Sequence, residues 1–519
     1  MSSQQHNPHQ NTPITHLDQV VDLVSEGGWL DTDLYSTAWV AMVPSLENRS
    51  RPAWPQALAY VRESQLGDGS WGDPQIYYAH ARVINTMAAI IALRQWSFPG
   101  DEARIGRGLA ALHRDMLQIP KEVHQPIGFE LIFPSLLARL GETSEQFPPE
   151  VLNLIDQLRT QKMSLINSLT PDPKKPHAWW FSMEMLPTSE LATLQEQFLD
   201  DVGSVATSPA ATAALLRARR LLGWDSPHAA DYLQRLLDKG NGAVPFAWPV
   251  EIFEQLWMLD TYRRAGYSPD DKPEFRPLLD SLYKQWQAGK PGLSYSAMFP
   301  INDGDITAIG YTVLTWGGYD ISDDPLLALW GDDDDCSKTY PNELGASVST
   351  NIHMLTALRS QPGMPRLQYI DKINRWLASQ VKQETLFDDK WHLSPFYTVS
   401  HALSAFQGLN PALANECMTF ILAHQQQDGG WSWFGPSTLE ETAHCILALH
   451  EVHKLGLLKD PAYITCAAET FRELASQPVP RMWIGKALYH PTKIVDALVD
   501  ATSHVLAEYG VHLTITHAS

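Results

Sequence analysis

Apolar residues recur at helical spacing along most of this chain. Residues 78–95, 105–119, 149–168, 208–223 and 251–265 each carry apolar positions three and four residues apart, which places those positions on one face of an α-helix. Clusters of Pro and Gly separate these segments, and alternating strand-like runs are scarce. The pattern predicts an all-α fold built from antiparallel helix pairs.

Two seven-residue segments repeat near opposite ends of the chain. Residues 65–71 are QLGDGSW and residues 425–431 are QQQDGGW, so both follow the pattern Q-x-x-D-G-x-W. The alternative is two coincidental turns, but a match of this length favours related structural units. We expect the glutamine to lie at a helix end and the tryptophan to stack back on the preceding helix. Each repeat would then connect one helix pair to the next, and one copy near each end of the chain predicts two related helical barrels.

Length, charge and cysteine usage narrow the class of protein. A chain of 519 residues exceeds one ordinary core, so two or three domains are expected. The formal net charge of -21 disfavours nucleic acid as a partner. Four cysteines without CxxC spacing indicate a reducing compartment and no structural zinc. Residues 1–13 are expected to be a disordered tail rather than a signal peptide, which predicts a cytoplasmic protein without a transmembrane segment.

Aromatic residues are unusually frequent, with 18 Trp, 17 Tyr and 16 Phe. Such residues ordinarily fill cores. They can also line a pocket in which the faces of their rings stabilise a cation.

Two aspartates stand at the head of an apolar run. Asp303 and Asp305 lie two residues apart in the segment PINDGDITA, just before the apolar residues 309–316. Either aspartate could be the N-cap of a helix that begins here. The alternative is an acid pair, because two carboxylates at short range cannot both ionise and can share one proton.

The repeats and the aspartate pair together resemble the class II terpene cyclases. The repeats look like the QW motifs of triterpene cyclases and class II diterpene cyclases, and DGDITA at 303–308 is similar to the D-x-D-D-T-A signature of that family. Other segments resemble bacterial copalyl-diphosphate-synthase-like enzymes, and the whole resemblance covers about residues 30–500. These segments are residues 34–44, 128–134, 208–213, 389–395, 440–443 and 483–486.

The resemblance implies two α-barrel domains with the active site between them. Residues 14–38 would form the first helix of the β domain, 39–268 an inserted γ domain, and 269–519 the rest of the β domain. The implied reaction begins when the middle aspartate, Asp305, protonates a terminal double bond of a linear geranylgeranyl chain, and the carbocation then closes fused rings. Protonation of this kind requires no cofactor.

One position of the signature departs from the family, and a supporting motif follows the signature in the chain. Ile306 stands where the family carries its third aspartate, which should change how Asp305 is tuned and reprotonated. Asn351 matches the orienting asparagine of the family, and Ser347 lies four residues earlier on the same predicted helix face. The resemblance implies that both orient Asp305; the alternative is an ordinary buried polar pair.

Aromatic side chains replace the usual terminating base. Plant copalyl enzymes remove the last proton with a His–Asn pair, and the matching positions here are Phe181 and Phe246. Two apolar rings cannot accept a proton, but they can guide a carbocation and exclude water. Tyr295 and Glu130 are therefore the candidate bases. The predicted pocket wall consists of Phe181, Phe246, Trp180, Tyr295 and Trp248.

The head-group site also departs from the family. Leu344 stands where enzymes acting on prenyl diphosphates usually carry an arginine, which leaves Lys390 and Lys338 as candidate head-group contacts. The acidic run at 331–335 is a solvated loop unless Mg²⁺ bridges it to a diphosphate. These departures favour a prenylated aromatic substrate, a geranylgeranyl hydroxybenzoate, as in meroterpenoid cyclases resembling merosterolic acid synthase. The alternative is a copalyl or labdane-type cyclase that acts on geranylgeranyl diphosphate with Mg²⁺.

The sequence leaves two other functions open. Loss of the third aspartate is compatible with an inactive scaffold that binds an isoprenoid or a partner protein. A glycan-processing α-barrel would need separated carboxylates flanking a polar cleft, and the Trp-rich repeats disfavour it. The expected partner is a small isoprenoid, whose apolar chain is compatible with transient contact with a membrane.

Overall fold

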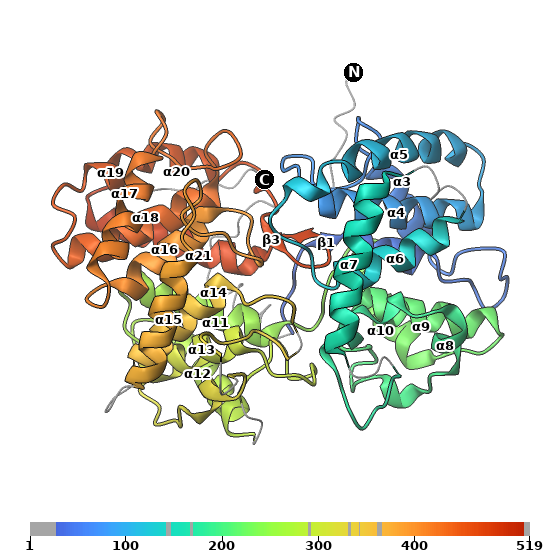
Figure 1. The fold of residues 1–519 in the computed structure, drawn as a ribbon, viewed down its shortest axis with the longest axis horizontal. Coiled ribbons are helices and arrows are strands. Elements are labelled where there is room, and N and C mark those ends of the chain that lie inside the picture. Colours follow the sequence, from blue (N-terminus) through green and yellow to red (C-terminus); the bar gives the residue numbers. More distant parts are fainter. Residues whose placement is uncertain are drawn as a thin grey trace.

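The computed structural model describes residues 27–141, 147–166, 170–288, 292–330, 334–341, 343–360 and 366–512. Helices make up most of it. Its strands are two residues long and pair into two-stranded sheets (Figure 1). The all-α prediction is confirmed, and the five helices predicted from periodicity are α4, α5, α7, α9 and α11. The expected tail, residues 1–13, lies outside the described residues.

The N-terminal group of helices, blue to green in Figure 1, closes into a ring. Within this ring α2 packs on α4, α4 on α6, α6 on η3, η3 on α9, and α9 on α2 again. The remaining helices lie outside the ring. The bounds are α2 (Leu34–Ala41), α3 (Pro55–Glu63), α4 (Ala79–Trp96), α5 (Asp101–Met116), η1 (Ile119–Lys121), α6 (Phe129–Leu140), α7 (Pro149–Leu165), η3 (Ala178–Met185), α8 (Thr188–Thr193), η4 (Glu196–Phe198), α9 (Pro209–Leu221) and α10 (Pro227–Lys239).

The C-terminal group, yellow-green to red in Figure 1, closes into a second ring. Its inner helices follow the order α11, α13, α14, α16, α18, α21, and α21 packs back on α11. Side-chain caps begin several of them, such as Ser394 for α16 and Thr438 for α18. The bounds are α11 (Glu251–Arg264), α12 (Phe275–Gln287), α13 (Gly304–Trp316), η5 (Asp324–Leu327), α14 (Val348–Arg359), α15 (Leu367–Ser379), α16 (Pro395–Phe406), α17 (Pro411–Ala423), α18 (Leu439–Lys454), α19 (Ala462–Cys466), α20 (Ala468–Leu474) and α21 (Thr492–Glu508).

The packing of the two rings can be compared with the domain bounds expected from the sequence. Residues 14–38 were expected to form the first helix of the β domain, but α2, which starts within them, closes the N-terminal ring; residues 14–26 lie outside the described residues. Helix α11 falls within the expected γ domain at 39–268, yet it closes the C-terminal ring with α13 and α21. The packing therefore favours a boundary before α11 instead of the expected 268/269.

The two Q-x-x-D-G-x-W repeats make matching contacts in the two rings. Trp71 Nε1 donates to the carbonyl oxygen of Val61 at 2.7 Å, and Trp431 Nε1 donates to that of Ile421 at 2.8 Å. Both indoles are fully buried. The Nε2 of Gln65 donates to Arg104 O at 2.9 Å, as Gln425 Nε2 does to Tyr463 O at 2.8 Å. The first repeat thus connects α3 to α5, and the second connects α17 to α19, so each links one helix pair to the next, as the sequence predicted.

A hairpin from the C-terminal group reaches the N-terminal group. It consists of β3 (Trp483–Ile484) and β4 (Leu488–Tyr489), and it lies near β1 (Thr32–Asp33), which pairs with β2 (Val244–Pro245) (Figure 1). The backbone N–H of Ile127 donates to Gly485 O in its turn at 2.8 Å.

Lys486, in the same turn, joins the two groups by charge. Its buried ammonium donates to Glu184 Oε1 and to Ser208 Oγ, both at 2.7 Å.

No described helix is both long and apolar enough to cross a bilayer.

Candidate active site

A cavity of about 570 Å³ lies between the two helical rings. Its walls come from both, because η3 and the segment before α11 face the start of α13 and the β3–β4 hairpin. Many of its large side chains are aromatic, and these rings can hold a cation against their faces. The aromatic lining residues are Trp179, Phe181, Phe246, Phe253, Trp257, Tyr295, Phe299, Tyr340, Trp391, Tyr397, Trp483 and Tyr489.

The cavity has a solvent-facing part and a dry part. Val123 and Leu344 line the first and are 70% and 40% exposed. Asp305 and Tyr397 line the second, where they are 7% and 2% exposed. A molecule bound along the cavity would therefore have one end near water and the other end sealed from it.

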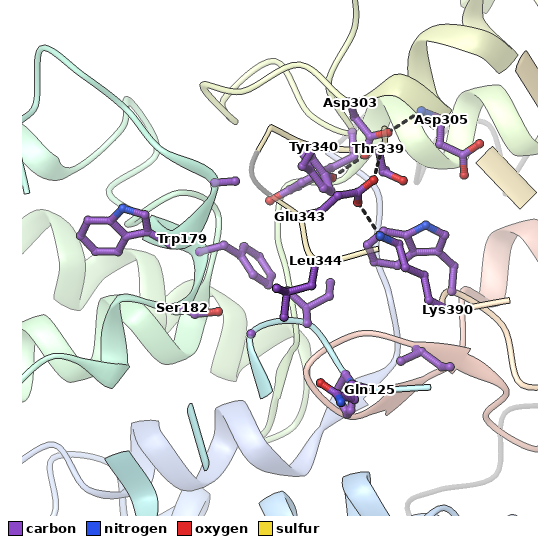
Figure 2. A pocket seen from close by; sticks show the side chains of 18 of the residues that line it. Gln125, Trp179, Ser182, Asp303, Asp305, Thr339, Tyr340, Glu343, Leu344 and Lys390 are labelled. Atoms are coloured by element: carbon purple, nitrogen blue, oxygen red, sulfur yellow. Dashed lines mark hydrogen bonds and ion pairs between the residues drawn. The ribbon is translucent and has the colours of Figure 1, made fainter. Parts of the chain in front are cut away.

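Asp303 is the N-cap of α13, one of the two roles considered from the sequence. Its Oδ1 accepts the backbone N–H groups of Asp305 and Ile306 at 2.8 and 3.1 Å. Its Oδ2 accepts the hydroxyl of Tyr340 (Figure 2). Burial and the neighbouring Asp305 raise the pKa of Asp303 to about 7.

Asp305 occupies the first turn of α13 and faces the cavity. Its Oδ1 lies 2.6 Å from Nδ1 of His353 on α14. Among the contacts of the described residues, no hydrogen bond joins the carboxyl groups of Asp303 and Asp305. The expected shared proton is therefore not observed, because Asp303 uses its oxygens for the helix cap and Tyr340.

The motif expected to orient Asp305 has a different task. Ser347 caps α14 by accepting the N–H of Thr350 at 3.0 Å, and it donates to Asp389 at 3.0 Å. Asn351 bonds the backbone of Ser337 in both directions, at 2.8 and 3.0 Å. This corrects the expectation for both residues, since neither contacts Asp305.

His353 holds the place expected of Asn351, and sequence reasoning missed it. It lies two residues further along α14, on the side of the helix that faces Asp305. The residue type could have indicated this role from the sequence, because an imidazole can donate a hydrogen bond to a carboxyl group as an amide can. His353, and not Asn351, therefore contacts the carboxyl group of Asp305.

Three of the five predicted wall residues line the cavity. Phe181, Phe246 and Tyr295 do so, and the rings of Phe181 and Phe246 meet edge to face with centroids 5.7 Å apart. Trp180 and Trp248 lie outside the lining, which corrects their prediction. Trp180 packs against Phe198, and Trp248 packs against Tyr232 and donates its Nε1–H to a backbone carbonyl.

The two candidate bases differ in their surroundings. Tyr295 shares a 2.8 Å hydrogen bond with Thr207, and burial raises its pKa well above 10. Tyr295 therefore keeps its proton and is a poor base. Glu130 lines the cavity 3.5 Å from the ammonium group of Lys162, so it is a paired carboxylate at the cavity wall.

Of the two lysines predicted for the head group, one lines the cavity and the other does not. Lys390 lines the cavity, forms an ion pair with Glu343 and donates to Gly345 O at 2.7 Å (Figure 2). Leu344 lines the cavity beside them. Lys338 lies outside the lining and pairs with Asp334 at 3.5 Å.

The acidic run was also considered for the head group. Residues 331–333 lie outside the described residues, and neither Asp334 nor Asp335 lines the cavity. In the part of the chain that the structure describes, no three His, Cys, Asp or Glu side chains are grouped as a metal site requires.

The site is suited to generating and holding a carbocation. A carboxyl group with one oxygen hydrogen-bonded to an imidazole can release the proton on its other oxygen. The aromatic walls then stabilise positive charge and keep water away.

Several known proteins are similar to this chain, although no protein-family model matches it. It is 30% identical over 492 residues to a type B diterpene cyclase of Mycobacterium tuberculosis, which covers 91% of this chain and 95% of that protein. It is 31% identical over 332 residues to a (-)-kolavenyl diphosphate synthase of Tripterygium wilfordii, which covers 62% of this chain and 39% of the plant protein.

The fold is similar to solved structures over nearly the whole chain. An ent-copalyl diphosphate synthase from Streptomyces platensis superposes with a TM-score of 0.73 at 25% identity, over 94% of this chain and 99% of that one. The ent-copalyl diphosphate synthase of Arabidopsis thaliana superposes with a TM-score of 0.64 at 22% identity, over 94% of this chain and 63% of that one. The second likeness shows the fold alone.

Proposed function

Because this chain belongs to the class II terpene cyclases, which start cyclisation by protonation, we propose that Asp305 is its general acid and a linear geranylgeranyl chain its substrate. In this proposal Asp305 Oδ2–H transfers its proton to the terminal double bond of the chain. The resulting carbocation is attacked by the next double bond, and successive attacks close fused rings. Loss of one proton from the last carbocation then gives a cyclic isomer of the substrate.

The observation that carries the proposal is the position of Asp305. Its carboxyl group lines the dry part of the cavity, and an imidazole hydrogen-bonds its far oxygen. An alkene is a very weak base, so the acid has to act without competition from water. The inactive scaffold considered from the sequence would not require an acid placed in this way.

The aromatic walls support the later steps. Trp257, Tyr397 and Trp483 line the same dry part, and their ring centroids lie 5.1 to 6.4 Å from one another where they form pairs. Faces of such rings stabilise a nearby cation by about 0.5–2 kcal/mol each. Phe181 and Phe246 offer no proton acceptor, so we expect the cation to persist past the point at which a His–Asn pair would end the reaction.

For the head group we propose a diphosphate. Plant relatives are named kolavenyl and copalyl diphosphate synthases, and Lys390 and Lys162 both line the cavity. Each of these lysines pairs with a glutamate, so the diphosphate would need Mg²⁺ to offset its charge. The relatives thus favour the alternative over the aromatic head group preferred from the sequence.

The geranylgeranyl hydroxybenzoate remains the second candidate because of Leu344. This apolar side chain lines the cavity next to the neutralised pair of Lys390 and Glu343, and an aromatic ring would pack against it at lower cost than a diphosphate.

A direct comparison of the two substrates tests the head group. We expect purified protein with Mg²⁺ to convert geranylgeranyl diphosphate into a cyclic isomer of unchanged mass, detected by gas chromatography and mass spectrometry after dephosphorylation. The aryl substrate, assayed by liquid chromatography, should be left unchanged. Turnover of the aryl substrate alone would overturn the diphosphate assignment, and turnover of neither would oppose the proposed function.

Asp303 should give the reaction a pH dependence near neutrality. Its pKa of about 7 means that it becomes negative as the pH rises through 7. A negative charge on Asp303 opposes the departure of a proton from its neighbour, so the rate should fall over that range. Asp303→Asn keeps a helix cap and should remove this step in the rate–pH profile. An unchanged profile in Asp303→Asn would contradict the role of Asp303.

A further inference from the structure

A line of hydrogen-bonded side chains extends from Asp305 away from the substrate cavity. His353 Nδ1 lies 2.6 Å from Asp305 Oδ1, and its Nε2 lies 3.0 Å from Nδ1 of His401. The Nε2 of His401 lies 2.8 Å from Nη1 of Arg264. The four residues come from α13, α14, α16 and α11, which all belong to the C-terminal ring. Closure of that ring therefore assembles the line.

Arg264 decides the direction of every hydrogen bond in this line. A guanidinium group has donors only and stays charged in proteins, so His401 Nε2 is an acceptor and carries no proton. A neutral His401 then carries its proton on Nδ1 and donates to His353 Nε2. As a result, His353 carries its proton on Nδ1 and donates to Asp305 Oδ1.

The surroundings keep this direction from reversing. Burial, the charge of Arg264 and two neighbouring histidines lower the pKa of His401 well below 6.5, so His401 stays neutral. Arg264 is itself held in place, since Nε donates to Glu451 Oε1 and Nη2 to Ser400 O, both at 3.3 Å. Its side chain is only 3% exposed.

We propose that Arg264, acting through His401 and His353, fixes which oxygen of Asp305 carries the reactive proton. Because Oδ1 accepts the N–H of His353, the acidic proton resides on Oδ2. After the proton leaves, the same N–H stabilises the carboxylate. Arg264 and His401 are positioning residues, since neither lines the substrate cavity. The inference rests on the proposed role of Asp305.

A second cavity, of about 250 Å³, raises a different explanation. His353, His401 and Arg264 all line it, so the same line could be a wire that returns a proton to Asp305 after each turnover. A wire that begins at Arg264 is excluded, because its guanidinium group retains its protons at any working pH. His353 and His401 also line this cavity. In our proposal the line is a lock, which fixes the positions of the protons, and the substitutions below test it against proton entry at either histidine.

Two substitutions at His401 separate a lock from a wire. In His401→Gln, the amide oxygen can accept from Arg264 and the amide nitrogen can donate to His353, so the direction is kept. His401→Leu removes both hydrogen bonds. We expect the single-turnover rate with geranylgeranyl diphosphate to fall about 100-fold in His401→Leu and to stay near the native rate in His401→Gln. Circular dichroism and thermal unfolding would verify that both variants fold.

The other outcomes all count against the lock. Equal loss or equal retention of the single-turnover rate in the two variants would contradict it. A normal first turnover in His401→Leu followed by loss of later turnovers would identify a proton wire and overturn the proposal.

A spectroscopic measurement tests the lock without any substrate. In ¹⁵N NMR spectra of histidine-labelled protein, we expect His353 to show a protonated Nδ1 and an unprotonated Nε2. Arg264→Met should give a mixture of tautomers, and Arg264→Lys, which keeps a charged donor, should restore the native pattern. A proton on Nε2 in the native protein, or identical spectra for native and Arg264→Met, would overturn the proposal. Failure here is distinguishable from failure of the proposed function, because no turnover is required.

Discussion

Asp305→Asn is expected to abolish cyclisation while leaving the protein folded. The amide keeps the shape of the carboxyl group and can still accept the N–H of His353, but it has no acidic proton to give. Removal of a general acid lowers a rate by about 100- to 10,000-fold, and we expect the upper part of that range because an alkene cannot react without the proton. The measurement is the rate of formation of cyclic product from geranylgeranyl diphosphate.

Two controls make the result on Asp305 interpretable. Asp303→Asn introduces the same chemical change two residues earlier, where the side chain caps α13, and it should retain most of the activity at low pH. Quenching of tryptophan fluorescence by an unreactive prenyl analogue would show that Asp305→Asn still binds the chain. If Asp305→Asn kept activity comparable to that of the native protein, the acid would have to be another residue.

Lys486→Met should destabilise the protein more than any surface substitution. Lys486 is fully buried, and its ammonium group is the cation that pairs with Glu184 at 2.7 Å. Removing one partner leaves the other charge buried without compensation, which costs about 3–5 kcal/mol. The cation also lies 4.4 Å from the ring centroid of Phe181, so the cavity wall should loosen too. The measurement is the free energy of unfolding from denaturant titration.

A double-mutant cycle isolates the pair from its surroundings. Glu184→Gln alone should cost less, because burial already lowers the pKa of Lys486 and the lysine can lose its charge. The double variant should recover part of the loss caused by Lys486→Met, since no unpaired charge then remains. Purely additive effects of the two substitutions would contradict a buried ion pair that joins the two rings.

Local patterns in the sequence determined the helices and the repeats. Apolar spacing of three and four residues predicts helices because it depends on neighbours within one turn. The Q-x-x-D-G-x-W segments could be interpreted for the same reason, since the Gln, the turn and the Trp act over a few residues. Asp303 and Asp305 were recognisable because the acid motif is continuous in the chain.

Contacts between distant segments were decided only by the tertiary structure. Which ring contains α2 or α11 depends on closure between helices far apart in the chain, so the local pattern could not assign either helix to a ring. Trp180 and Trp248 adjoin true wall residues in sequence, but the backbone turns them away from the cavity.

The partner of the acid was settled in the same way. Asn351 and His353 lie two positions apart on one helix, and their side chains point in directions about 200° apart. Only the packing of α13 against α14 determines which of them meets Asp305, and only the closed ring brings His401 and Arg264 behind it. The sequence by itself therefore indicated the candidate acid, and the tertiary structure decided which groups lie against it.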